Sequence, residues 1–352
     1  MGAGDGARER ARALVLRHGW NVASYQILNP GMRLWFAAAG DAVAGYVAHA
    51  RTWVVAGAPV CADDRLPGVA AELESAARAT GARVVYFGAG ARLERLYAPR
   101  RTHRLLLLGA QPVWDAPGWP DVVRHKASLR AQLNRARNKG VAVREWPSTE
   151  AQGHPALRAV LDEWLSTRGL PPLHFMTEPD TLGDLRDRRV FVAESGGPVA
   201  FLVATPVPAR HGWLVEQWPR AARAPNGTTH LLVDAAMRAL AADGAHYVSL
   251  GLAPLSDRAG AIGEGEPAWL RLLLRWLRAH GRRFYNFAGL DAFKASLAPH
   301  AWEPIYAIAP GRLGPRTLAA VAGAFGGGSP LRLVATALVM AAAREARALL
   351  AR

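Results

Sequence analysis

The feature that most constrains the fold is an order of short apolar runs and amphipathic segments that occurs twice along the chain. The first copy, residues 20–112, is typical of hairpin strands around Gly40-Asp41, followed by a helix, a strand, a helix and a strand. The second copy, residues 154–310, predicts a helix, two strands around Ser195-Gly196-Gly197, a third strand, a helix, a strand, a helix and a final strand. The copies share this order without obvious sequence identity. We therefore predict an α/β (α+β) fold that is duplicated along the chain.

A strongly basic segment separates the two copies. Residues Val122–Arg144 contain seven Lys and Arg side chains and no acid. We predict one helix from Pro120 to Lys139, ended by Gly140, with an apolar stripe on one face and a cationic stripe on another. The apolar stripe comprises Leu129, Leu133 and Ala136, and the second stripe comprises Lys126, Arg130, Asn134 and Arg137. One face of this connecting helix can therefore pack while the other stays cationic, although a solvated face is the usual fate of such charge runs.

Composition limits the class of partner and the compartment. The formal net charge of +15 and the pI of about 11 favour an anionic partner such as nucleic acid, anionic lipid or a phosphorylated substrate. The single cysteine, Cys61, excludes an internal disulfide and fits a reducing compartment. The first residues do not resemble a secretory signal, and the apolar run Leu333–Ala343 is too short to span a bilayer. We therefore expect a soluble cytoplasmic protein, with peripheral contact at the inner membrane face as an option.

The same patterns suggest how the chain is divided. We expect an N-terminal domain over residues 1–119, the basic helix and a strand over 120–145, a catalytic domain over 146–312 and a helical tail over 313–352. In the tail, "AGAFGGGSP" predicts a flexible break before a terminal helix. That helix would either dock on the body of the protein or lie on a membrane surface.

Common catalytic signatures are missing from the sequence. It contains no GxSxG, HExxH, GxxxxGK[ST] or CxxC motif, and its 11 histidines show no metal-ligand spacing. The sequence therefore predicts neither a metal site nor a bound cofactor. It leaves open a chemistry that works by positioning substrates that are already activated.

Three strings in the second half carry a family resemblance. They are "APNG" at 224–227, "SLGLAPLS" at 249–256 and "FYNFAGLDAFKASLAPHAWEPIY" at 284–306. Together with the basic segment and the duplicated layout, they resemble the aminoacyl-phosphatidylglycerol synthases, the phosphatidylglycerol lysyltransferase C-terminal domain of the multiple peptide resistance factor. The resemblance covers roughly residues 20–310. It implies a tandem of two GNAT-like acyltransferase domains that are joined by the basic helix. It also implies an enzyme that moves an aminoacyl group from aminoacyl-tRNA to a lipid hydroxyl.

The resemblance places acyl transfer in the second half, where two neighbouring strands of a GNAT-like domain splay apart. Here these strands would be "WLVEQW" and "YVSLGLAP". We expect Glu216 to bind the substrate ammonium or act as a base, His230 to act as acid or base, and Lys294 to hold a phosphate or stabilise developing charge. The substrate-binding candidates are Arg220, Arg223, Asn226, Gly227, Ser249, Gly251, Tyr285, Asn286, Trp302 and Glu303. The candidate contacts to tRNA or phosphate are Lys126, Arg130, Arg135, Arg137 and Lys139.

Two alternatives to an aminoacyltransferase that modifies phosphatidylglycerol, a related lipid or a small-molecule amine remain open. The first is a coenzyme A-dependent N-acyltransferase, although Pro225 removes one amide donor from the loop that would hold the pyrophosphate. The second is a non-catalytic protein that binds RNA or an anionic membrane, which the net charge by itself would support. Compared with the family pattern, Ala58, Glu216 and His230 replace or alter three carboxylates, which disfavours a cationic aminoacyl group such as lysine.

Overall fold

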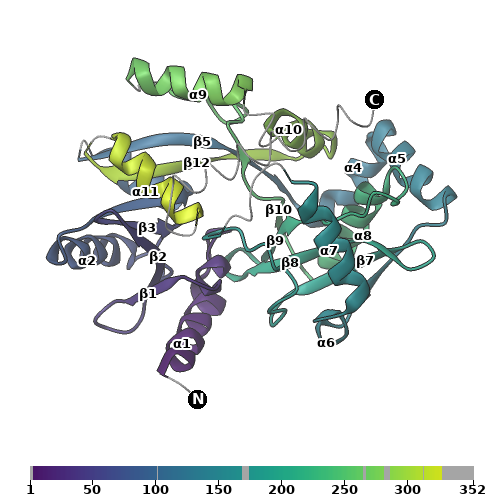
Figure 1. The fold of residues 1–352 in the computed structure, drawn as a ribbon, viewed down its shortest axis with the longest axis horizontal. Helices are drawn as coiled ribbons and strands as arrows, with labels where there is room; N and C mark the ends of the chain where they lie inside the picture. Colours follow the sequence, from purple (N-terminus) through teal and green to yellow (C-terminus); the bar gives the residue numbers. More distant parts are fainter. Residues whose placement is uncertain are drawn as a thin grey trace.

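A single mixed sheet with helices on its faces forms the frame of the computed structural model (Figure 1). The structure describes residues 3–100, 102–168, 174–264, 267–280, 286–311 and 313–326. Eleven strands follow the order β1-β2-β3-β4-β12-β5-β10-β9-β8-β7-β6, and β11 pairs with β5 beside this path. The predicted α/β class is therefore confirmed. None of the helices in the described ranges is long and apolar enough to cross a membrane.

The first half has the predicted order of elements. Its bounds are α1 Ala3–His18, β1 Arg33–Phe36, β2 Val43–His49, β3 Thr52–Ala56, α2 Leu66–Ala79, β4 Arg83–Ala89, α3 Ala91–Tyr97 and β5 His103–Trp114. Strands β1, β2 and β3 are antiparallel neighbours, and α2 then carries the chain to β4, which runs parallel to β3. Parallel strands need such a helical crossover.

The second half repeats this arrangement. Its bounds are β6 Ala142–Trp146, α6 Ser148–Ala151, α7 Pro155–Ser166, β7 Arg189–Glu194, β8 Pro198–Val207, β9 Gly212–Gln217, α8 Thr228–Ala242, β10 Tyr247–Ser249, β11 Ala253–Pro254, α9 Ala268–His280, α10 Phe287–Ser296 and β12 Ala301–Pro310. Strands β6 to β9 are antiparallel neighbours, and α8 leads to β10, which runs parallel to β9. The predicted duplication is therefore confirmed by the topology of the two halves.

The two halves exchange their last strands. Strand β5, the last of the first half, pairs with β10 of the second half, and β12, the last of the second half, pairs with β4 of the first. Strands β5 and β12 also pair with each other from Ala301 opposite Val113 to Pro310 opposite His103. The sheet therefore runs without interruption across the boundaries expected at residues 119 and 146. Those boundaries remain a prediction about the chain.

The basic connecting segment differs from the single helix predicted over Pro120–Lys139. It forms two helices, α4 Trp119–His125 and α5 Ala127–Asn138, which meet at Lys126. Lys126 has φ −100° and ψ 89°, outside the helical region, and Arg130 donates hydrogen bonds to the carbonyl oxygens at the end of α4. The side chain of Arg130 thus satisfies acceptors that the helix end leaves open. Periodicity alone did not reveal this break because the apolar spacing continues through it.

The tail also departs from the expectation. Helix α11 covers Pro315–Phe325 and includes the first part of the predicted break, because Ala320 and Ala324 pack into the core of the first half. The predicted terminal helix lies outside the described residues.

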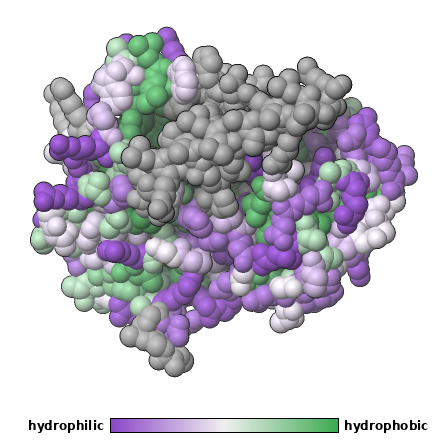
Figure 2. Space-filling model, viewed as in Figure 1, coloured by the Kyte–Doolittle hydropathy of each residue, from purple (hydrophilic) through white to green (hydrophobic). Residues whose placement is uncertain are grey.

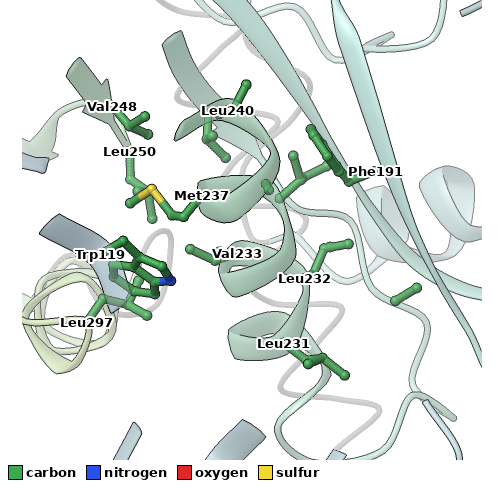
Figure 3. Close-up of a cluster of buried hydrophobic side chains, with 14 of the residues drawn as sticks. Trp119, Phe191, Leu231, Leu232, Val233, Met237, Leu240, Val248, Leu250 and Leu297 are labelled. Carbon is green, nitrogen blue, oxygen red and sulfur yellow. The ribbon is translucent and has the colours of Figure 1, made fainter. Parts of the chain in front are cut away.

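Helix α8 forms the centre of the largest apolar core, which lies in the second half (Figure 3). Side chains from β7, β10, α10 and the connecting segment surround it. The predicted apolar stripe of α5, Leu129, Leu133 and Ala136, is fully buried in this core and is confirmed. Burying each leucine stabilises the docked helix by about 2 kcal/mol. The basic segment is therefore fixed to the second half along one side.

Candidate functional site

Strands β9 and β10 diverge near their carboxyl ends, as the resemblance implied. Their parallel pairing covers three residues and ends where Ser249 lies opposite Leu214. Strand β9 continues to Gln217, whereas the chain after β10 turns at Gly251, with φ +72°, and joins β5 as β11. The Ser249 hydroxyl donates to the carbonyl of Pro112 and accepts from the Gly251 amide, so it fixes this turn. A gap in main-chain pairing therefore opens beside the Gly251 turn.

Lys294 approaches this turn from α10. Its side chain is 2% exposed, and its Nζ donates to the carbonyl oxygens of Gly251 at 2.8 Å and Leu252 at 2.9 Å. Burial lowers the pKa of Lys294 to about 7, with Asp291 opposing the shift. A buried amine that titrates near neutral pH is typical of functional sites, and it can donate to an anion or exchange a proton. The geometry thus agrees with a catalytic role, which stays a prediction.

A network of polar side chains supports α10 from the other side. Asp291, one turn before Lys294, accepts from the Ser256 hydroxyl at 2.6 Å and from Arg258 Nε at 3.0 Å. The Arg258 guanidinium also lies over the ring of Trp302, 4.9 Å from its centroid. Trp302, predicted to bind substrate, is therefore half-buried and linked to the Lys294 helix through one arginine.

His230 lies on the first turn of α8 and contacts the same helix. Its ring is 5.2 Å from the Phe293 ring, and its Nε2 is 3.4 Å from the Ser296 hydroxyl. Phe293 also packs 5.4 Å from the ring of Trp218, which follows β9. Burial lowers the pKa of His230 below 6.5, so the imidazole is neutral at pH 7 and able to accept a proton. The ends of β9, α8 and α10 therefore meet around Phe293.

Glu216 occupies a special position in the backbone of β9. Val203 of β8 pairs with Gln217, and the next residue, Ala204, pairs with Val215, so Glu216 is the extra residue of a β-bulge. Bulges change the direction of a side chain and often lie beside active sites. The Glu216 side chain lies outside the described part of the structure, so its assigned role stays a prediction.

The "APNG" loop packs against the basic segment. Gly227, with φ +94°, lies so close to α5 that a Cβ there would be 2.2 Å from the Gln132 carbonyl oxygen. Asn226 is exposed at the tip of the turn. Arg223 donates to the carbonyl of Pro198 at 2.8 Å. The loop that precedes α8 therefore connects the divergent strands to the connecting segment.

The predicted cations of the basic segment have different surroundings. Arg137 donates to the carboxylate of Asp234, which is 1% exposed and also accepts from Trp119 and Arg238. Arg137 therefore helps to dock α5 on α8, and Arg130 caps α4 as described above. Arg135 and Lys139 are exposed. These two cations and the half-buried Lys126 form the part of the basic segment that agrees with the predicted surface for an anionic partner.

Glu303 lies on the opposite face of the sheet from Trp302, because successive residues of a strand alternate between faces. Its carboxylate accepts two hydrogen bonds from Arg210 at 2.6 and 3.0 Å and others from Gln111 and Tyr247. Burial raises the pKa of Glu303, but the charge and hydrogen bonds of Arg210, together with the hydrogen bonds from Gln111 and Tyr247, outweigh it and hold the pKa below 4.5. Glu303 therefore links the two halves, and its predicted contact with substrate remains untested.

The remaining candidates lie around α10 and the loop after β9. Asn286 caps α10 by accepting from the Gly289 amide, and Tyr285 lies outside the described residues. Arg220 is exposed and pairs through its backbone with Ala200. Within the described ranges, the structure thus links His230, Gly251 and Trp302 to α10, the helix that carries Lys294, and Ser249 fixes the turn at Gly251. It places Glu303 apart.

Sequence reasoning missed the residues that support Lys294. Asp291 precedes it by three positions on one helix face, a spacing that does predict contact. Ser256 ended a quoted motif without an assigned role, and Arg258 follows two residues later. Their contacts depend on how the β11 loop returns over α10, which no local pattern predicts.

Comparisons with known proteins agree with this geometry. The sequence matches the family model described as phosphatidylglycerol lysyltransferase, C-terminal, over residues 12–309. A search of curated proteins gave no significant match. A C-terminal domain assigned to lysylphosphatidylglycerol synthetase from Agrobacterium fabrum is similar in structure, with TM-score 0.77, 23% identity and coverage of 93% of this chain and 99% of that chain.

Two other solved structures share the fold. L-PGS from Bacillus licheniformis has TM-score 0.74 and 22% identity over 90% of this chain and 96% of that chain. FemX has TM-score 0.52 and 10% identity over 85% of this chain and 95% of that chain. At these identities the structures show the fold alone, whereas the family model spans most of the sequence. The chain therefore belongs to the phosphatidylglycerol lysyltransferase C-terminal domain family.

Proposed function

We propose that this chain transfers an aminoacyl group from an aminoacyl-tRNA to a hydroxyl group of phosphatidylglycerol or a related lipid. Family membership supports transfer to such an acceptor. The observation that carries the proposal is the buried Lys294 amine, held by two carbonyl oxygens where β9 and β10 diverge. A protein that only binds RNA or lipid does not need a buried amine with a pKa near 7 at that position, whereas a transferase can use one.

The proposed reaction needs little chemical assistance because an aminoacyl ester is already activated. The acceptor hydroxyl oxygen bonds to the ester carbonyl carbon, and the bond from that carbon to the tRNA ribose oxygen then breaks. Neutral His230 accepts the hydroxyl proton and returns it to the leaving ribose oxygen. The Lys294 ammonium stabilises the negative charge that develops on the carbonyl oxygen. Glu216, at the bulge, binds the α-ammonium group of the aminoacyl moiety.

The donor is proposed to approach along the basic segment. The exposed Arg135 lies on α5 and the exposed Lys139 directly follows it, and α5 also packs against Gly227 in the loop before α8. Phosphate groups of a tRNA acceptor end would neutralise such cations and release counterions. Binding of the donor should therefore weaken as the salt concentration rises, and more steeply for the wild type than for a variant without these charges.

A transfer assay tests the proposal. Radiolabelled aminoacyl-tRNAs from a panel of amino acids are incubated with phosphatidylglycerol vesicles, and the label in the lipid phase is counted. We expect one aminoacyl group to be transferred, Lys294→Met to lose at least about a hundredfold in rate, and Arg33→Ala, at the far edge of the sheet, to retain it. The rate should fall as pH rises through about 7, where Lys294 loses its proton.

Other outcomes would contradict the proposal. If no aminoacyl-tRNA gives transfer to lipid, peptide or small amine, the chain is not an aminoacyltransferase. Tight binding of an acyl-coenzyme A, measured by calorimetry, would instead favour an N-acyltransferase. Salt-sensitive RNA or vesicle binding with no transfer in any assay would favour a non-catalytic role.

A further inference from the structure

Helix α9 presents a row of large apolar side chains to solvent. Trp269, Leu272, Leu273 and Trp276 are 41%, 64%, 36% and 53% exposed. Their spacing of i, i+3, i+4 and i+7 places all four on one face of the helix. Figure 2 shows the corresponding hydrophobic patch at the upper edge of the molecule, where Figure 1 draws α9. An apolar face of this kind marks an interaction surface.

Separate residues attach α9 to the protein. Leu270 is completely buried and Leu274 packs beside it, against a small core formed with β4, β5 and β12. The exposed row therefore lies on a different side of the helix from the packing side. Burial in this chain's own core accounts for Leu270 and Leu274, whereas the exposed surface of Trp269, Leu272 and Leu273 lies outside that core.

The charges of α9 indicate the kind of partner. The helix contains Arg271, Arg275 and Arg278 and no acidic residue, and all three arginines are exposed. Tryptophan and leucine on one face with arginine on the next are typical of helices that lie in a membrane interface. Thirteen residues span about 20 Å, less than the roughly 30 Å of a hydrocarbon core, so such a helix lies along a bilayer instead of crossing it.

We propose that α9 docks this protein on an anionic bilayer, with its exposed tryptophans and leucines among the acyl chains and with Arg271 and Arg275 on the lipid phosphates. This inference rests on the proposed transfer to a lipid, and it adds how the protein reaches a lipid acceptor that lies in a bilayer. A bilayer explains the arginines, because each cation near an anionic surface adds favourable electrostatic free energy. A protein partner or a second copy would explain the apolar row but not the lack of any acid on α9.

The position of α9 relative to Lys294 supports this docking. Arg278 donates to Asp257 at 2.9 Å, so the carboxyl end of α9 is tied to the loop after β11. The residues on either side of Asp257 are Ser256 and Arg258, which both contact Asp291, one turn before Lys294. A membrane under α9 would thus lie next to the loop that supports the amine.

Vesicle cosedimentation tests the inference without any tRNA. The wild type is expected to sediment with vesicles of equal parts phosphatidylglycerol and phosphatidylcholine, and far less with phosphatidylcholine alone. Leu272→Ala/Trp276→Ala and Arg271→Glu/Arg275→Glu should each lower the bound-to-free ratio by about tenfold or more. The matched control, Arg33→Glu/Arg51→Glu, reverses two exposed charges of the first half that have no assigned role, and it should bind vesicles nearly as the wild type does. Equal binding by the wild type and both α9 variants would overturn the proposal.

A second readout separates this inference from the proposed function. Transfer to phosphatidylglycerol in vesicles should fall in the α9 variants, whereas transfer to a short-chain phosphatidylglycerol below its micelle concentration should be unchanged. Loss of transfer to both acceptors in the α9 variants, with an unchanged melting temperature, would overturn the docking role. Absence of transfer by the wild type would overturn the proposed function and leave the vesicle result standing. A wild-type dimer that the Leu272→Ala/Trp276→Ala variant dissociates, seen by light scattering, would show that α9 binds a second copy and would overturn the bilayer proposal.

Discussion

Replacing Lys294 by methionine should change how the stability of this protein depends on pH. Burial lowers the pKa of Lys294 in the folded protein to about 7 from an ordinary value of 10.5. The folded state therefore binds fewer protons than the unfolded state between these values, and its stability should rise with pH across that window. Below about pH 7 the charged amine destabilises the fold by about 5 kcal/mol, from 3.5 pKa units at 1.36 kcal/mol each.

The pH dependence is a better test than the stability at one pH. Methionine has a similar volume, but it leaves the carbonyl oxygens of Gly251 and Leu252 without the Lys294 donor, at about 1–3 kcal/mol each. The loss of these hydrogen bonds offsets much of the stability that is gained at low pH by removing the buried charge. The hydrogen-bond loss, however, does not change with pH. At pH 9 the pH is only about 1.5 units below the pKa of Lys294 in the unfolded state, so the destabilisation caused by Lys294 falls to about 2 kcal/mol. Between pH 6 and pH 9 the wild type should therefore gain about 3 kcal/mol relative to Lys294→Met.

Urea unfolding followed by tryptophan fluorescence at pH 6, 7, 8 and 9 measures this difference. The control is Lys139→Met, which makes the same replacement at an exposed lysine at the end of α5. Parallel pH profiles for the wild type and Lys294→Met would refute the reasoning, because they would mean that Lys294 has the same proton affinity in both states. Burial would then not lower the pKa of Lys294, and this pKa would not support a catalytic role.

Three further changes test the rest of the site. Arg210→Met should lower the free energy of unfolding by about 1–2 kcal/mol at pH 7, because it leaves the half-buried Glu303 carboxylate without its cation; adding Glu303→Gln should recover part of that loss in urea titrations. Gly227→Ala should reduce stability by about 1–3 kcal/mol, since its φ is positive and its Cβ would overlap α5; an unchanged urea midpoint would contradict the packing. Arg137→Ala should lower the melting temperature whereas Arg135→Ala should not, although Arg135→Ala should weaken tRNA binding in a filter assay.

Local patterns predicted the elements of this protein well. The hairpin around Gly40-Asp41, the crossover helices and the apolar stripe of α5 are all in the structure, because side-chain periodicity and turn residues act within a few positions. Two helices, α10 and α11, were not predicted from these local patterns. Helix α10 lies in a string quoted only as a family motif, and α11 contains glycine where a break was expected. Gly323 is needed there because a Cβ would be 2.7 Å from the His49 ring.

The sequence by itself determined a duplicated α/β chain with a cationic connecting segment and named several of the residues that lie together at the divergence of β9 and β10. Only the tertiary structure decided that β5 and β12 are exchanged between the halves, that Arg137 is used to dock α5, and that Glu303 accepts hydrogen bonds from Arg210 and Gln111. Strand partners, ion pairs and burial depend on residues hundreds of positions apart, and they form when apolar surface is removed from water across the whole sheet. The environment of Lys294, which sets its pKa, belongs to this second group.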